Sequence, residues 1–309
     1  MEMKKIGLIG LGACGTVYAA ALQQAFGENF RVVARGRRAR RLGEWRLNGE
    51  SLHFLTPEEG WQADLLWVAV KNYDLETAID DIRPYVGAHT VLLPTLNGIS
   101  AKAVLSAAFP YNTVLYGVDM RIDALRQENG VVLTKPAHIV FGKEYNENPD
   151  PEVLAVAAVL EQAGISHEIG ANMIRETWKK WMWNIGFNQV TAALDATYGD
   201  VATIPEIYDL AERAMFEVYA VAQYMEIPLS TDDILVKRYA YQNAAPYGKT
   251  SMAQDMEAGR PTEVEYFAGM LSSLSQRTNT PCPVNEALYL IIKAREAQKR
   301  AAAGREAMP

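Results

Sequence analysis

A glycine-rich segment near the N-terminus constrains the fold of this chain more than any other feature. It follows the short apolar run Lys5–Ile9, opens the small, apolar stretch Gly12–Ala25, and reads Gly10-Leu11-Gly12-Ala13-Cys14-Gly15. Glycines at this G-x-G-x-x-G spacing, between a strand and a helix, permit a tight turn, close approach of the backbone to a pyrophosphate, and close helix packing. The helix N-terminus also presents backbone N–H groups to phosphates. The segment therefore predicts a dinucleotide-binding turn, with a plain packing motif as the alternative.

The pattern around this turn extends to a whole domain. Strand-like apolar runs alternate with helix-like segments as far as residue 163. The expected strands are Lys5–Ile9, Phe30–Ala34, Asp64–Val70, Thr90–Leu93 and Thr113–Val118, and the expected helices are Gly12–Ala25, Leu75–Ile82, Ile99–Ala108 and Glu152–Ala163. Val131–Leu133 and His138–Phe141 look like an added antiparallel pair. This β-α-β alternation predicts an α/β fold: a Rossmann-type, doubly wound parallel sheet with helices on both faces.

The second half of the chain has a different pattern, because strand signals nearly vanish after Gly170. Long helical patterns cover Asn172–Ala193, Glu206–Tyr224, Asp232–Ala245, Glu263–Thr278 and Asn285–Ala303. Thr262, with Glu265 three residues later, has the form of a capping box at the start of one of them. We therefore expect two domains: a Rossmann-type nucleotide-binding domain over residues 1–170 and an all-α domain over residues 171–309.

Composition narrows the partners and the compartment. The 309 residues carry a formal net charge of −7, whereas duplex-binding proteins are normally basic, so nucleic acid is not an expected partner. Cys14 and Cys282 are too few for a disulfide framework, and no cluster of metal ligands is visible, so no metal is expected. No apolar run approaches the length of about 20 residues that a membrane span needs. The resulting expectation is a cytoplasmic protein without a membrane segment.

The residues after the second expected strand indicate which dinucleotide is bound. A carboxylate about 20 residues beyond the glycines would bind the ribose 2′-hydroxyl of NAD. Phe30–Arg41 contains no acidic residue; the strand ends in Arg35, and further arginines follow at Arg37, Arg38, Arg40 and Arg41. Because a guanidinium matches the geometry of a phosphate, Arg35 favours NADP as the cofactor. We interpret Arg40 and Arg41 instead as solvent-exposed basic residues at the start of a helix.

A polar stripe lies within an otherwise apolar helix of the second expected domain. Lys180, Asn184 and Asn188 recur at i, i+4 and i+8 among large apolar residues such as Trp178 and Trp181. At about 3.6 residues per turn the three side chains share one face, and burying such groups without partners is costly. The stripe therefore indicates a functional cleft. A face toward bulk water and structural hydrogen bonds to another helix remain the alternatives.

The residue types of the stripe suit the reduction of a ketone. Hydride addition builds negative charge on the carbonyl oxygen, and Lys180 can supply both a proton and a nearby positive charge. The carboxamides of Asn184 and Asn188 can hydrogen-bond substrate oxygens without adding charge. The stripe is thus a candidate for the catalytic and substrate-binding groups of a reductase.

Four further positions are candidates of lower specificity. Lys71 and Asn97 follow the third and fourth expected strands, at the carboxyl edge where open α/β sheets bind ligands. As isolated residues they could equally be ordinary loop residues. Physical reasoning alone would assign Ser251 and Glu263 to structural roles. Glu263 falls at an expected helix start, where a carboxylate is favoured electrostatically.

Together, these residues give the chain a resemblance to the ketopantoate reductase (2-dehydropantoate 2-reductase) family along nearly its whole length. The matching features are the glycine segment, an arginine after the second strand, Val70-Lys71, Leu96-Asn97-Gly98, the W-x-K-x-x-x-N-x-x-x-N helix of Trp178–Asn188, and Ser251-Met252-x-Gln254-Asp255 with Thr262-Glu263. The chain departs from the family pattern at Tyr198, and Arg121–Asn129 matches it only loosely.

The resemblance implies an NADPH-dependent oxidoreductase that reduces 2-dehydropantoate to (R)-pantoate in coenzyme A precursor synthesis. It implies Lys180 as the proton donor, and as substrate ligands Asn97, Asn184, Asn188 and Ser251. The implied cofactor ligands are the glycine segment with Arg35, Lys71, Asn97, Ala124 and Glu263. It also implies a hinged cleft and, because dimers are common in the family, a homodimer. Two alternatives stay open: a paralogue that reduces another 2-oxo acid, and a non-catalytic NADPH-binding sensor.

Overall fold

The structure is a computed structural model, and it describes residues 2–120, 123–127, 129–235 and 245–306. The chain divides into two compact units, Met1–Thr177 and Trp178–Pro309, which we call the N-terminal and C-terminal units. The domain boundary expected at residue 170 stays a prediction, because compactness does not show that each part folds by itself. Most of the helix expected over Asp232–Ala245 lies outside the described residues.

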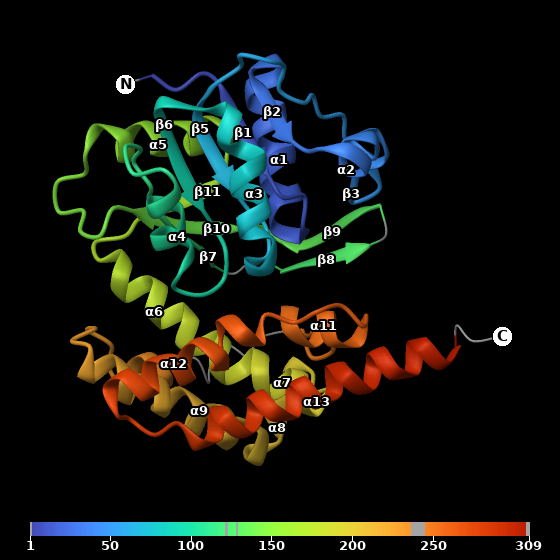
Figure 1. The fold of residues 1–309 in the computed structure, drawn as a ribbon, viewed down its shortest axis with the longest axis vertical. Coiled ribbons are helices and arrows are strands. Elements are labelled where there is room, and N and C mark those ends of the chain that lie inside the picture. Colours follow the sequence, from blue (N-terminus) through green and yellow to red (C-terminus); the bar gives the residue numbers. More distant parts are fainter. Residues whose placement is uncertain (1, 121–122, 128, 236–244, 307–309) are drawn as a thin grey trace. The chain divides into compact units, whose positions relative to one another are not determined.

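A parallel sheet of four strands forms the centre of the N-terminal unit (Figure 1). Its strands lie in the order β2 (Phe30–Val33), β1 (Ile6–Ile9), β5 (Ala63–Val68) and β6 (Val86–Pro94). β1 pairs in parallel with both of its neighbours, so the sheet grows in one direction to β2 and in the other through β5 to β6. The direction in which the strand order grows thus reverses at β1. Open parallel sheets bind ligands at the carboxyl ends of the strands beside such a reversal, which here is the end of β1.

Helices cover both faces of this sheet, because successive strand residues point to opposite sides. The helices of the unit are α1 (Ala13–Phe26), α2 (Gly36–Arg40), α3 (Leu75–Ile82), α4 (Ala101–Ala108) and α5 (Pro151–Gln162). Leu65 and Trp67 of β5 belong to a buried cluster that includes α1 and α5. Leu66 and Val68 belong to a second cluster that includes α3 and α4. The expected Rossmann-type, doubly wound sheet is confirmed.

Two smaller sheets complete the N-terminal unit. One has the order β11 (Ser166–Ile169), β10 (His138–Gly142), β7 (Tyr116–Met120), and the other has the order β4 (Glu50–Ser51), β3 (Arg46–Leu47), β9 (Gly130–Lys135), β8 (Asp123–Gln127). The expected pairing of Val131–Leu133 with His138–Phe141 is wrong, because β9 pairs with β8 and β3, whereas β10 pairs with β7 and β11. The residue pattern within a strand identifies the strand but does not specify its partner.

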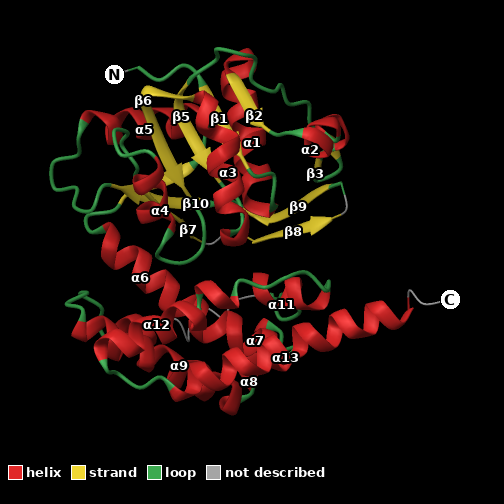
Figure 2. Ribbon diagram, in the orientation of Figure 1, coloured by secondary structure: helices red, strands yellow, loops and turns green. Residues whose placement is uncertain are grey.

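Every regular element that the structure describes beyond Ile169 is helical (Figure 2). Helix α6 (Met173–Trp183) leads into a π-helical turn, η5 (Asn184–Asn188), and then into α7 (Gln189–Leu194). The remaining elements are α8 (Tyr198–Thr203), α9 (Pro205–Tyr224), α11 (Ser251–Glu257), the 3-10 turn η6 (Val264–Tyr266), α12 (Ala268–Thr278) and α13 (Pro283–Glu306). The expected all-α C-terminal part is confirmed. Within the described ranges, no helix combines the length and the apolar character that crossing a membrane requires.

A buried glutamine ties the helices of the C-terminal unit together. The Gln189 side chain is fully buried, donates to Asn285 Oδ1 of α13 at 2.9 Å, and accepts from the backbone nitrogen of Ala268 at 3.0 Å. Asn285 in turn donates to Glu217 Oε2 of α9 at 2.7 Å. A buried polar group that loses its partner costs about 1–3 kcal/mol. This network therefore fixes α7, α9, α12 and α13 in one arrangement.

The helix expected over Glu263–Thr278 begins later than the sequence pattern indicates. Its α-helical part, α12, starts at Ala268, and the expected capping box is wrong. The Thr262 hydroxyl instead donates to Glu296 at 2.6 Å, and Glu265 accepts from Tyr289 and Lys293. These partners all lie on α13, 24 to 34 residues further along the chain. Long-range contacts therefore replace the local cap.

Candidate active site

The glycine turn after β1 depends on the lack of side chains at Gly10 and Gly15. Gly10 has a φ of +104°, and a Cβ atom there would lie 2.5 Å from the backbone oxygen of Ala69. A Cβ atom on Gly15 would lie 1.9 Å from the backbone oxygen of Gly10, which leaves no space for any side chain. The two glycines therefore fix the turn and let β1, α1 and the segment after β5 pack closely.

Gly12 stands in a different environment, because a Cβ atom there would meet nothing within 4 Å. It is the N-cap residue of α1, with a φ of −78° and no side chain that could cap the helix. Packing within the protein therefore does not require glycine here, whereas an anion at the helix N-terminus would benefit from the exposed backbone. Leu11 and Cys14 are half-buried against the apolar cluster beneath α1, and Ala13 is the first residue of that helix.

The helix that follows the turn is anchored by a buried phenol. The hydroxyl of Tyr18 on α1 donates to Asp119 on β7, and its ring stacks on Trp67 with 4.3 Å between ring centroids. Burial raises the pKa of Tyr18 well above its usual value, and the nearby charge of Asp119 acts in the same direction. Tyr18 therefore stays protonated at neutral pH and holds α1 against β5 and β7.

The segments after β5 and β6 lie side by side at the carboxyl edge of the sheet. The Asn72 carboxamide donates to the backbone oxygen of Asn97 at 2.7 Å, and the backbone nitrogen of Thr95 donates to Val68 at 2.9 Å. Lys71 and Asn97 are both half-buried there. The structure thus brings these two predicted residues together on neighbouring segments. Asn72 has no predicted role from the sequence, although its 3% exposure and its contact with Asn97 show that it organises this edge.

Arg35 lies just beyond β2, as the N-cap residue of α2, and 53% of its side chain is exposed. Its Nε atom lies 3.2 Å from Oδ1 of Asp81 on α3, and its Nη2 atom donates to the backbone oxygen of Asp81 at 3.4 Å. Arg38 Nη2 similarly lies 3.6 Å from Oδ2 of Asp74, the N-cap residue of α3. Arg35 and Arg38 therefore pair with carboxylates of α3. The sequence between Phe30 and Arg41 does not reveal these carboxylates, because they lie further along the chain.

Ala124 lies on β8, in the sheet that also contains β3, β4 and β9. It is half-buried opposite Leu133 of β9, and both strands contact α1. Ala124 therefore belongs to a different sheet from the strands that lead to Lys71 and Asn97.

The predicted stripe Lys180, Asn184 and Asn188 lies on the continuous helical segment formed by α6 and η5, within the C-terminal unit. Lys180 and Asn184 are half-buried, and Asn188 is 8% exposed. Asn188 Nδ2 donates to the hydroxyl of Ser251, the first residue of α11, at 3.5 Å. The structure thus joins Ser251 to the end of the stripe, and burial of these groups shows that the stripe is not a fully solvated face.

The stripe does not follow the regular α-helical spacing that the sequence predicts, because Asn184–Asn188 forms a π-helical turn. Gly186 stands inside this turn, and a Cβ atom there would lie 2.5 Å from Met215 Cγ and 2.9 Å from the backbone oxygen of Ala211. Helix α9 therefore packs directly on the backbone of the turn. A π-turn closes i→i+5 hydrogen bonds and contains more residues per turn than an α-helix. The direction of the Asn188 side chain relative to Asn184 therefore differs from the one that a regular α-helix would give. Such turns within α-helices frequently occur at functional sites.

Glu263 is 3% exposed and lies on the segment that joins α11 to α12. The neighbouring Thr262 is held by Glu296 of α13, which accepts from its backbone nitrogen at 2.8 Å and from its hydroxyl at 2.6 Å. Arg260 forms an ion pair at 2.8 Å with Asp255 of α11. Glu263 stands at a helix start, as expected, but the helix is the 3-10 turn η6, of which it is the N-cap residue, and the α-helix begins only at Ala268.

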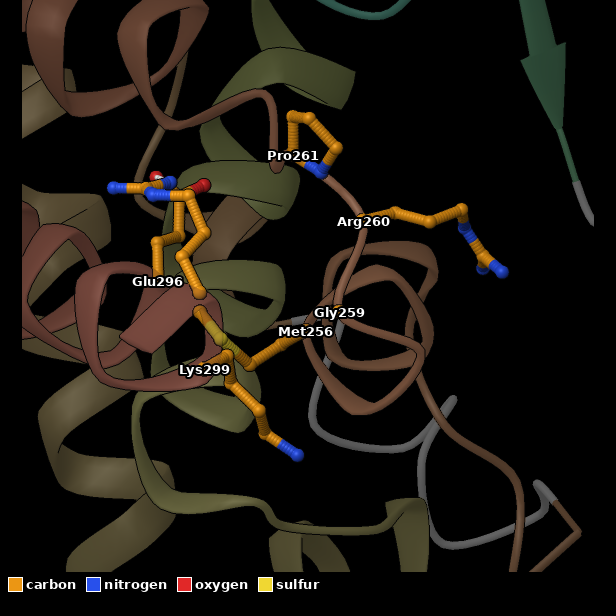
Figure 3. Close-up of a pocket in the computed structure, with 7 residues that line it drawn as sticks. Met256, Gly259, Arg260, Pro261, Glu296 and Lys299 are labelled. Carbon is orange, nitrogen blue, oxygen red and sulfur yellow. Dashed lines mark ion pairs between the residues drawn. The ribbon is translucent and has the colours of Figure 1, made fainter. Parts of the chain in front are cut away.

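A small cavity of about 40 Å³ lies beside this loop. It is lined by Met256, Gly259, Arg260, Pro261, Glu296, Lys299 and Arg300. Figure 3 shows that Arg260 points away from Glu296 and Lys299. None of these lining residues is a predicted site residue. Over the described ranges, no three His, Cys, Asp or Glu side chains are arranged to hold a metal ion.

The N-terminal unit has a parallel sheet with a glycine turn after its central strand, and the C-terminal unit is helical and carries a partly buried polar stripe. These features define a Rossmann-type nucleotide-binding protein of two units. Residues 6–145 match the family described as ketopantoate reductase PanE/ApbA, and residues 172–296 match the ketopantoate reductase PanE/ApbA C-terminal family. The chain belongs to the ketopantoate reductase family. The resemblance found in the sequence is thereby confirmed.

Individual relatives agree with this assignment. The chain is 30% identical to the 2-dehydropantoate 2-reductase of Halobacterium salinarum over 75% of each chain. The solved 2-dehydropantoate 2-reductase of Methylococcus capsulatus is 26% identical over 96% of this chain and 97% of that chain, with a TM-score of 0.80. A solved D-mandelate dehydrogenase with NADH and anilino(oxo)acetate shares the fold at 20% identity, over 96% and 99% of the two chains, with a TM-score of 0.85. The chain is an oxidoreductase of this family, and its fold also occurs in an enzyme with a different substrate name.

Proposed function

We propose that this protein reduces 2-dehydropantoate to (R)-pantoate with NADPH. The observation that carries the proposal is the partly buried stripe of Lys180, Asn184 and Asn188, joined to Ser251, in a member of the ketopantoate reductase family. One ammonium and several neutral hydrogen-bonding groups suit a 2-oxo acid, whose carbonyl oxygen gains negative charge during reduction.

Each group of the stripe has its own task in the reaction. When bound, the cofactor supplies a hydride to the carbonyl carbon of the substrate. The Lys180 ammonium stabilises the charge that develops on the carbonyl oxygen and donates a proton to that oxygen. Asn184, Asn188 and Ser251 hydrogen-bond the other substrate oxygens and orient the acid for the reaction. Asn97 is a further substrate ligand, on the strength of the family resemblance.

Residues of the N-terminal unit fit a dinucleotide. The open space at Gly12 leaves the N-terminus of α1 accessible to a pyrophosphate, and the rest of the turn, from Gly10 to Gly15, supplies the surrounding backbone. Lys71 and Asn97, at the same edge of the sheet, bind the nicotinamide and ribose end. Ala124 and Glu263 are assigned to the cofactor on the family resemblance alone.

Arg35 supports NADPH rather than NADH as the preferred cofactor. Its guanidinium is half-exposed just beyond β2, where a 2′-phosphate binds in Rossmann-type folds. The solved D-mandelate dehydrogenase with NADH shows that a protein of this fold also takes the unphosphorylated cofactor. The preference for NADPH therefore rests on Arg35. A homodimer and a cytoplasmic location remain further predictions.

The proposal is tested by following NADPH oxidation with a panel of 2-oxo acids. The panel contains 2-dehydropantoate, its unbranched analogues and aromatic 2-oxo acids such as benzoylformate. We expect the highest kcat/KM for 2-dehydropantoate. A clear preference for another member of the panel would replace the substrate while keeping the reaction type.

A second candidate function is the reduction of another 2-oxo acid, which the likeness to a D-mandelate dehydrogenase favours. The same panel distinguishes it, because an aromatic acid would then exceed 2-dehydropantoate in kcat/KM. A non-catalytic sensor would bind NADPH and oxidise it with no member of the panel. The half-buried Lys180 argues against the sensor, since cofactor binding alone needs no proton donor.

A further inference from the structure

The arginine that the proposed function assigns to the 2′-phosphate already has an anionic partner. Arg35 Nε lies 3.2 Å from Oδ1 of Asp81, and Arg35 Nη2 donates to the backbone oxygen of Asp81 at 3.4 Å. Asp81 thus occupies the Nε–Nη2 edge of the guanidinium. A guanidinium has five N–H donors in a planar fork, so the Nη1 side remains available for a second anion.

The aspartate is the more firmly held partner of this pair. The Asp81 side chain is 19% exposed, compared with 53% for Arg35. Its neighbours on α3, Ile79 and Ile82, are buried against the sheet, which fixes the orientation of the helix. An anion that binds Arg35 therefore meets a carboxylate that cannot turn freely into solvent.

A second pair repeats this arrangement. Arg38 Nη2 lies 3.6 Å from Oδ2 of Asp74, at the other end of α3. Both side chains are more exposed than Asp81, at 70% for Arg38 and 37% for Asp74, so their interaction is more strongly screened by solvent. Asp81 is therefore the carboxylate with the larger expected effect on a ligand of Arg35.

We propose that Asp81 limits the preference of this protein for NADPH over NADH. The inference rests on the proposed function, because it takes Arg35 as the ligand of the 2′-phosphate. A phosphate monoester carries about −1.5 to −2 charges at neutral pH, so it is repelled by Asp81 and must share Arg35 with it. A ribose 2′-hydroxyl carries no charge and meets neither penalty. Asp81 thus acts on one cofactor and leaves the other nearly unaffected.

The test variant is Asp81→Asn, which removes the charge and keeps an oxygen that can accept from Arg35 Nε. The control variant is Asp80→Asn, which removes the same charge from the adjacent, exposed position of α3. Dissociation constants are measured by calorimetry on the full chain for NADPH and NADH. The same measurement is made for adenosine 2′,5′-bisphosphate and AMP, which occupy only the adenosine end and need no catalytic step.

We expect Asp81→Asn to tighten NADPH and adenosine 2′,5′-bisphosphate about fivefold at low salt, and less as the ionic strength rises. NADH and AMP should change by less than about twofold, as should all four ligands with Asp80→Asn. A structural role for Asp81 would instead move phosphorylated and unphosphorylated ligands together. Equal changes for both kinds of ligand, no change, or weaker binding of the 2′-phosphorylated pair would overturn the inference.

Failure of the proposed function gives a different result. If the protein binds 2′-phosphorylated ligands but reduces no 2-oxo acid, the reductase proposal fails, and the affinity ratio alone decides the role of Asp81. If the wild-type protein binds neither 2′-phosphorylated ligand, the assignment of Arg35 and the inference about Asp81 are both wrong.

Discussion

Glu296 accepts two hydrogen bonds from Thr262, one from the backbone nitrogen at 2.8 Å and one from the hydroxyl at 2.6 Å. The carboxylate is 7% exposed and also lies 3.7 Å from Arg300 Nη1. Thr262 immediately precedes Glu263, which the proposed function assigns to the cofactor. The last helix of the chain therefore fixes a loop with an assigned role in cofactor binding.

Replacing this carboxylate should destabilise the protein. Glu296→Ala leaves the buried donors of Thr262 without an acceptor, so we expect a loss of about 1–3 kcal/mol in the free energy of unfolding. Urea denaturation measures this loss. Gln298→Ala, at an exposed position of the same helix, should change stability by less than about 0.5 kcal/mol. Equal stability of the two variants would show that the loop does not depend on Glu296.

Lys180→Ala should remove the proton donor and leave the fold intact. Loss of a general acid typically lowers the rate by about 10²–10⁴, so kcat should fall by that factor with NADPH and 2-dehydropantoate. The matched control is Lys179→Ala, whose ammonium lies over the Trp183 ring and has no assigned role in the reaction. A kcat close to that of the wild type for Lys180→Ala, in a variant with unchanged melting temperature, would assign the proton transfer to another group.

The glycines of the turn after β1 should respond differently to alanine. A Cβ atom on Gly15 would lie 1.9 Å from the backbone oxygen of Gly10, so Gly15→Ala should lower stability by at least about 1–3 kcal/mol. A Cβ atom on Gly12 meets nothing within 4 Å, so Gly12→Ala should keep the stability of the free protein and weaken cofactor binding. Thermal unfolding combined with NADPH titration separates the two effects. Normal NADPH affinity in Gly12→Ala would argue against a pyrophosphate at this position.

Arg35→Ala should weaken NADPH much more than NADH. A hydrogen-bonded charge of this kind is worth about 1.5–3 kcal/mol, which corresponds to about tenfold to a hundredfold in the dissociation constant of NADPH. The control is Arg40→Ala, in the solvated part of the same arginine-rich segment. Fluorescence titration of both cofactors measures the effect. Parallel losses for NADPH and NADH would contradict a phosphate-binding role for Arg35.

The stability of the protein should fall in alkali partly through Cys282. Burial raises the pKa of this thiol from 9.0 to about 11. Its contribution to stability is therefore complete below pH 9, where both the folded and unfolded thiols are protonated, and is lost as the pH rises through about 11. The stability difference between wild type and Cys282→Ala should shrink by about 2–3 kcal/mol over that range. Urea denaturation at each pH measures this difference.

Ionisation of Tyr116, whose pKa burial raises to about 12, affects the wild type and Cys282→Ala alike. A constant difference would mean that burial does not raise the pKa of Cys282 in the folded protein.

Local patterns predicted the fold well where a structural element depends on its own residues. The glycine turn, the β-α-β alternation and the helices α9 and α13 follow from residue spacing, and the structure has them close to the expected positions. The partners of β9 and β10 were predicted wrongly, because alternation within a strand does not encode which strand lies beside it. The late start of α12 at Ala268 has the same origin, since Thr262 binds a residue 34 positions away.

The candidate site divides in a similar way. Lys180, Asn184 and Asn188 were visible as polar residues at a helical repeat, and Lys71 and Asn97 as polar residues after strands. Asn72, Asp81 and Glu296 were not assigned a role, because each acts through a residue that lies far away in the sequence. The π-turn also escaped prediction. It accompanies the close packing of α9 on Gly186, which is a tertiary contact rather than a local preference.

The π-turn means that the helical segment from Met173 to Leu194 contains a residue that an uninterrupted α-helix would not accommodate. Losing that residue would convert the turn into ordinary α-helix while the helices on either side keep their alignment. The side chains of Asn184 and Asn188 would then point in other directions, and the contact of Gly186 with α9 would have to adjust as well. The orientation of the polar stripe and the packing of α9 are therefore linked through a single extra residue.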